Sequence, residues 1–78
     1  MSRPVKRSLT LAGHRTSVSL EDAFWDAFRE IAREQGVTPA RLATEIDRQR
    51  GIETGLATAI RLFVLETYRA RLGLTGDG

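Results

Sequence analysis

A segment of strictly alternating polar and apolar residues, residues 15–20 (RTSVSL), restricts the folds open to this chain. A period of two residues is that of a half-buried β-strand, with one face on a core and the other in water. A strand by itself leaves the hydrogen-bonding groups of its edges unpaired, so it needs a partner strand. The predicted outward face consists of Arg15, Ser17 and Ser19, and the predicted inward face of Thr16, Val18 and Leu20.

The sequence offers two sources for the partner strand. Leu9 and Leu11 also alternate with polar residues, but at odd-numbered positions. In one straight strand they would lie on the face opposite the apolar residues of segment 15–20. Gly13 must therefore mark a bulge, a turn or the end of the upstream segment, and these alternatives stay open. The partner is then either a second short strand at residues 8–11 or a strand of another subunit.

After the strand, the apolar residues change to helical spacing. Residues 22–35 carry an apolar stripe, and Gly36 supplies the left-handed position that ends a helix. A second helix is predicted at residues 38–50, with Thr38 as its N-cap and Pro39 in its first turn.

A third helix is predicted at residues 54–72, capped by Thr54 and apolar nearly all round in its middle, so it must be enclosed. A chain of 78 residues buries a modest core, and the absence of cysteine excludes disulfides as a supplement. The remaining supplement is a second subunit. The predicted core of a homodimer consists of Val18, Leu20, Phe24, Phe28, Ile31, Leu42 and Ile46.

Basic residues are concentrated near the N-terminus. Residues 1–20 contain four bases and no acid, a pattern typical of an arm that contacts a polyanion. Residues 1–7 are predicted to form a flexible basic tail, residues 8–72 the folded domain and residues 73–78 a frayed end. No internal repeat is apparent.

Several classes of protein are excluded by missing residues. No apolar run reaches the length of a membrane span or resembles a secretory signal, so we expect a cytoplasmic protein without a membrane partner. The sequence contains neither a Cys nucleophile nor a phosphate-binding glycine loop, so we expect that the protein is not an enzyme and binds no cofactor. Asp22, Asp26 and Glu30 are interpreted as a solvated stripe rather than a metal site, and His14 is given no catalytic role.

The order of strand, helix, tight Gly36 connection and helix resembles the ribbon-helix-helix family of Arc and MetJ-like bacterial repressors. The run RSLTLAGHRTSVSLEDAFWDAF, followed by AIRLFVLETYR, is similar to a subfamily of short bacterial proteins with an added C-terminal helix. The resemblance implies a mainly α protein that forms an intertwined homodimer. In that family one strand from each subunit pairs antiparallel, and the resulting ribbon enters the DNA major groove.

The resemblance also implies site residues. Base contacts are expected from Arg15, which can bind guanine in a bidentate manner, and from Ser17 and Ser19. The N-terminus of the helix at 38–50 is expected to hold a phosphate. The expected phosphate contacts are Val37, Thr38 and Arg41 at that helix, and Arg3, Lys6 and Arg7 in the tail.

An alternative assignment makes residues 56–72 the second helix of the motif and residues 38–50 an insertion. The phosphate site would then lie at Thr54 and Gly55. The sequence leaves this choice open.

The leading functional hypothesis is a transcriptional regulator, in the manner of a repressor, whose dimers bind a short inverted repeat in double-stranded DNA, alone or as higher oligomers. One alternative is an antitoxin-type autoregulator with a toxin partner. A second alternative is a dimeric protein-interaction scaffold that has lost DNA binding, which the small size of Ser17 and Ser19 would favour.

Overall fold

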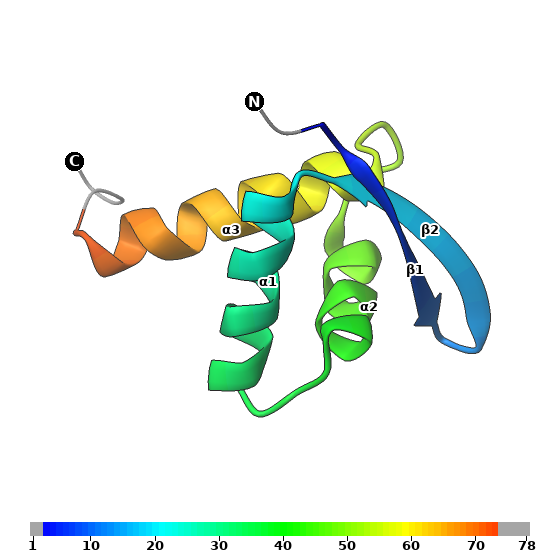
Figure 1. The fold of residues 1–78 in the computed structure, drawn as a ribbon, viewed down its shortest axis with the longest axis horizontal. Coiled ribbons are helices and arrows are strands. Elements are labelled where there is room, and N and C mark those ends of the chain that lie inside the picture. Colours follow the sequence, from blue (N-terminus) through cyan, green and yellow to red (C-terminus); the bar gives the residue numbers. More distant parts are fainter. Residues whose placement is uncertain (1–2, 74–78) are drawn as a thin grey trace.

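The computed structural model describes residues 3–73, which form a two-stranded antiparallel hairpin packed on three helices (Figure 1). In Figure 1, α1 and α2 lie side by side, and α3 crosses them at the end where α1 begins. The expectation of a mainly helical fold with N-terminal strand structure and three helices is confirmed. In chain order the elements are β1 (Val5–Leu11), β2 (His14–Leu20), α1 (Asp22–Glu34), α2 (Pro39–Gln49) and α3 (Leu56–Arg71).

A two-residue turn at Ala12 and Gly13 joins the strands. Both residues have positive φ, 51° and 84°, as in the mirror-image turns that match the twist of a β-hairpin. Glycine accepts this conformation without strain, whereas any side chain at position 13 would be unfavourable. Of the three alternatives for Gly13, the structure shows the turn.

The turn also explains why the two apolar sets have opposite parity in the sequence. It pairs Leu11 with His14, and the register continues through Leu9 with Thr16 and Arg7 with Val18. Because paired residues point to the same face, the odd-numbered residues of β1 share a face with the even-numbered residues of β2.

Strand β1 corrects two predictions. It begins at Val5, so residues 5–7 belong to the hairpin rather than to a flexible tail, and the strand is longer than residues 8–11. It also pairs with β2 along its whole length, so of the two partner strands that the sequence left open, the structure shows the one in the same chain. The end segments 1–2 and 74–78, also predicted to be flexible, lie outside the described residues.

The core is formed by a single chain. Six of the seven residues predicted for the dimer core, all except the half-buried Phe24, are buried among the residues of their own chain. The hairpin contributes Leu9 and Leu11 to this core, and α3 contributes Ile60 and Val64. These side chains pack on apolar surface that was expected to be buried by a second subunit. The buried apolar residues are Leu9, Leu11, Val18, Leu20, Phe28, Ile31, Ala32, Leu42, Ala43, Ile46, Ile60 and Val64.

Helices α1 and α2 match their predictions closely. Thr38 caps α2, its Oγ1 accepting a hydrogen bond from the Arg41 amide, and Pro39 is the first helical residue. Helix α3 differs, because Gly55 rather than Thr54 is its N-cap. Its enclosure is also incomplete, since Leu62 and Leu65 remain about half exposed, at 48% and 52%.

Arg61 ties α3 to the end of the hairpin. Its Nε donates to Glu21 Oε1 at 2.9 Å, and a terminal nitrogen donates to the Ser19 carbonyl at 3.2 Å. The hydrogen bond from Arg61 lowers the pKa of the Glu21 carboxyl below its ordinary value. This contribution to stability is therefore present at neutral pH and is lost only as the pH falls through that lowered pKa.

Candidate nucleic-acid interface

The outward face of the hairpin is polar along its whole length. The register places Lys6 opposite Ser19, Ser8 opposite Ser17 and Thr10 opposite Arg15, and all six residues are exposed. No acid interrupts the strands, because both consist of apolar, hydroxylic, basic and histidine residues. We call this surface, defined by Lys6, Ser8, Thr10, Arg15, Ser17 and Ser19, the ribbon face.

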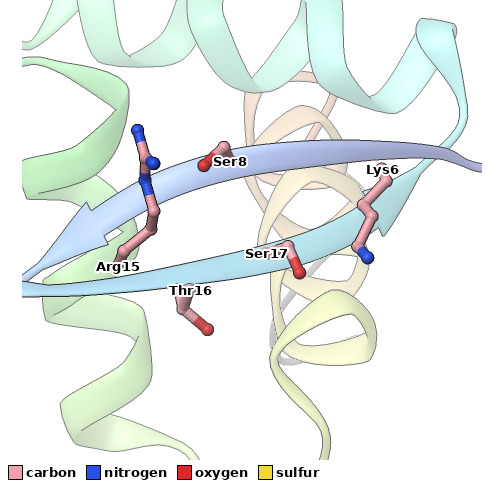
Figure 2. A pocket seen from close by; sticks show the side chains of 5 residues that line it. All are labelled: Lys6, Ser8, Arg15, Thr16 and Ser17. Atoms are coloured by element: carbon pink, nitrogen blue, oxygen red, sulfur yellow. The ribbon is translucent and has the colours of Figure 1, made fainter.

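The structure brings the three predicted base-contacting residues together. Arg15, Ser17 and Ser19 lie on one strand of the ribbon face, all pointing away from the core. A shallow, open hollow of about 370 Å³ lies over its middle, lined by Lys6, Ser8, Arg15, Thr16 and Ser17 (Figure 2).

Sequence reasoning missed half of this surface. Ser8 and Thr10 received no role, and Lys6 was assigned to a tail. The signal was present, since the segment VKRSLTL alternates as regularly as segment 15–20 once Arg7 is counted with the inner face. It was missed because the parity at Gly13 could not be resolved without the turn.

The ribbon face has the chemistry needed to contact base edges. Arg and Lys donate to guanine O6 and N7, and hydroxyl groups both donate and accept. Two strands lie about 5 Å apart, and the B-DNA major groove, about 12 Å wide, admits such a ribbon.

Arg7 does not belong to this surface, contrary to its predicted role as a phosphate contact. Its side chain lies on the inner face at 16% exposure, where a terminal nitrogen donates to the Leu20 carbonyl at 3.2 Å and to Asp22 Oδ1 at 2.6 Å. The guanidinium also lies over the Trp25 ring, 5.4 Å from its centroid. These contacts fasten β1 to the start of α1 and hold the charge inside the fold.

The predicted phosphate site at α2 retains only part of its donors. The Val37 amide donates to the Ala32 carbonyl at 3.0 Å, and the Arg41 amide donates to Thr38 Oγ1 at 3.1 Å. Both amides are therefore used within the protein, whereas the Arg41 residue itself is exposed, as is Arg3 ahead of β1. In the alternative assignment, the Thr54 amide is likewise engaged, donating to the Gly51 carbonyl.

No helix among residues 3–73 is long and apolar enough to cross a membrane. Within the same range, no group of three or more His, Asp or Glu residues is arranged to hold a metal ion.

Comparison with known proteins gives one match. The model of the ribbon-helix-helix domain family matches residues 4–68, from the residue before β1 to Tyr68 in α3. No curated protein and no solved structure matches the chain. The family match thus covers residues 7–28 and all but the last residue of 59–69, the two runs on which the resemblance in the sequence rested.

Proposed function

We propose, since this chain belongs to the ribbon-helix-helix family, that it is a sequence-specific DNA-binding transcriptional regulator whose ribbon face enters the major groove. The observation that carries the proposal is the ribbon face itself, with six exposed polar residues, two of them cations, and no acid. A surface that approaches a dense row of phosphates must avoid carboxylates, and this one does.

The proposed contacts divide into two kinds. Arg15, Ser17 and Ser19 contact base edges, and Arg15 carries most of the discrimination because a guanidinium can form two parallel hydrogen bonds to guanine. Arg3, Thr38 and Arg41 contact phosphates and set affinity rather than sequence preference.

The direct test is DNA binding as a function of salt. A protein that neutralises about four phosphates loses roughly a hundred-fold in affinity between about 50 and 200 mM salt. We expect this slope for the wild type on a 20-base-pair duplex. Ser17→Asp, which places a carboxylate in the middle of the ribbon face, should abolish binding, whereas the same change at the exposed Ala70 of α3 should not.

A scaffold without DNA affinity would show no binding to any duplex at low salt. That result would refute the proposal and favour the scaffold hypothesis, in which the ribbon does not bind DNA.

The regulator is also proposed to act as a homodimer. Its support is the apolar surface of α3, where Leu62 and Leu65 lie one turn apart and remain about half exposed. Exposed apolar area is unfavourable in water, and a chain of this size has only a small core to offset it. A second copy, related by a two-fold axis, would cover both residues, and the ribbon of each chain would stay intact.

Sedimentation at micromolar concentration tests this dimer. We expect a dimer for the wild type and a folded monomer for the double variant Leu62→Ser/Leu65→Ser, because neither leucine belongs to the buried core. A folded wild-type monomer at that concentration would contradict the proposal, and a variant that remains dimeric would place the interface elsewhere.

A further inference from the structure

The two strands of the hairpin carry the same six-residue pattern. Residues 6–11 read KRSLTL and residues 15–20 read RTSVSL. Both consist of a cation, a variable residue, Ser, an aliphatic residue, a hydroxylic residue and Leu, nine positions apart. This is a short internal repeat, so the prediction that the chain contains none was wrong.

The register turns the repeat into a two-fold arrangement. Moving each residue by nine positions converts the pair Lys6–Ser19 into the pair Arg15–Thr10 and leaves the pair Ser8–Ser17 unchanged. An approximate two-fold axis therefore passes through the ribbon face between Ser8 and Ser17. Figure 2 shows the consequence, with Lys6 and Arg15 at opposite ends and each side chain leaning across the other strand.

We infer that the hairpin of a single chain is a two-fold symmetric DNA-recognition surface in which Lys6 is the counterpart of Arg15, so that one chain contacts two guanines on opposite strands. The inference rests on the proposed function. A DNA duplex presents its two strands through two-fold axes perpendicular to the helix, so a symmetric ribbon makes equivalent contacts with both strands. In this chain the two-fold arrangement lies within one hairpin.

Geometry sets the spacing of the two guanines. Lys6 and Thr10, the residue paired with Arg15, are four residues apart on β1, which corresponds to about 14 Å along the strand. At about 3.4 Å per base pair, that distance spans roughly four base pairs. The inferred site is a short inverted repeat centred between the guanines.

The surroundings of Lys6 favour a base contact over a role in a loose tail. Lys6 lies within β1, held by the pairing with Ser19, and Arg7 beside it is engaged on the inner face. Lys6 is therefore the outward cation of β1, as Arg15 is of β2. An ammonium is a single point charge, whereas a guanidinium offers a fixed pair of donors. The preference for guanine should therefore be weaker in the half-site contacted by Lys6 than in the one contacted by Arg15.

The experiment selects binding sites from a random 20-base-pair duplex library at fixed salt. Wild type, Lys6→Ala, Arg15→Ala and Lys6→Arg are compared, with Arg29→Ala, an exposed cation on α1, as the control. For each hairpin bound to the duplex, we expect two guanine preferences related by inversion in the wild type. Each alanine variant should lose the guanine preference in one half-site. The ratio of its affinity for the selected sequence to its affinity for a duplex with that half-site mutated should fall roughly ten-fold or more.

Lys6→Arg provides a gain that a merely structural or tail role would not produce. With the same guanidinium at both ends, the two half-sites should become equally sharp, and affinity for the perfect inverted repeat should rise. Arg29→Ala should leave the selected sequence unchanged. Circular dichroism melts of all variants confirm that they are folded.

The outcomes separate the two proposals. If Lys6→Ala weakens all sequences equally while Arg15→Ala changes the preferred base, Lys6 is a phosphate contact and the inference is overturned, but the proposed function stands. If the wild type selects no sequence at all, sequence-specific regulation itself fails, and the inference falls with it.

Discussion

Replacement of Val18 by Asp is expected to leave the chain unfolded at room temperature. Val18 is 4% exposed and lies in the centre of the inner face, paired with Arg7. Burying a carboxylate in an apolar core costs several kcal/mol or forces local opening, and a domain of this size is stable by only about 4–12 kcal/mol. Far-ultraviolet circular dichroism should show the loss of helix.

Ser19→Asp is the matched control for this prediction. It adds the same charge one residue away, but on the ribbon face and opposite Lys6, where a cross-strand ion pair can form. This variant should fold normally and bind DNA poorly. A Val18→Asp protein that melts cooperatively near the wild-type temperature would show that Arg7 can neutralise the buried charge, and that the inner face is less dry than the structure indicates.

Arg15→Ala should reduce the ratio of specific to non-specific DNA affinity by roughly ten- to a hundred-fold while leaving the fold intact. A bidentate arginine contact to guanine contributes about 1–3 kcal/mol of discrimination, and the Arg15 side chain is exposed and makes no contribution to the core. Titration of a selected site and a scrambled site at the same salt concentration measures the ratio, with thermal melts alongside.

Arg41→Ala on α2 provides the comparison for this second prediction. As a proposed phosphate contact, it should weaken both duplexes by a similar factor and reduce the salt slope by about one. If Arg15→Ala behaves in the same way, with an unchanged ratio, Arg15 contacts phosphate and the base readers lie elsewhere on the ribbon face.

The predicted elements that proved reliable are those specified by neighbouring residues. The alternation of residues 15–20 became β2, and the apolar stripes of the first two helices became α1 and α2 with nearly the expected ends. The cap at Thr38 is local in the same sense, because its hydroxyl needs only the amide three residues ahead. At α3, the prediction of Thr54 as the cap was wrong, because the helix begins one residue later and Gly55 is its N-cap.

The positions of half of the ribbon face and of Arg7 depend on contacts between residues that are distant in the sequence. Lys6, Arg7 and Arg3 look alike in the sequence as cations of a polar N-terminus. Only the pairing of β1 with β2 places Lys6 outside and Arg7 inside, where the Leu20 carbonyl and Asp22 lie within hydrogen-bonding distance. Similarly, the apolar circumference of α3 did not reveal which leucines would remain exposed.

The sequence by itself determined the order of the elements, the polar and apolar faces of β2 and the helical stripes, because these patterns arise from side chains a few positions apart. The tertiary structure decided where β2 finds its partner. The turn at Ala12 and Gly13 places β1 against β2 in a register that unites two apolar sets of opposite parity and aligns the two repeats around Ser8 and Ser17. Strand pairing and turn conformation are properties of the folded backbone, so neither the single-chain ribbon nor its two-fold face could be derived from periodicity alone.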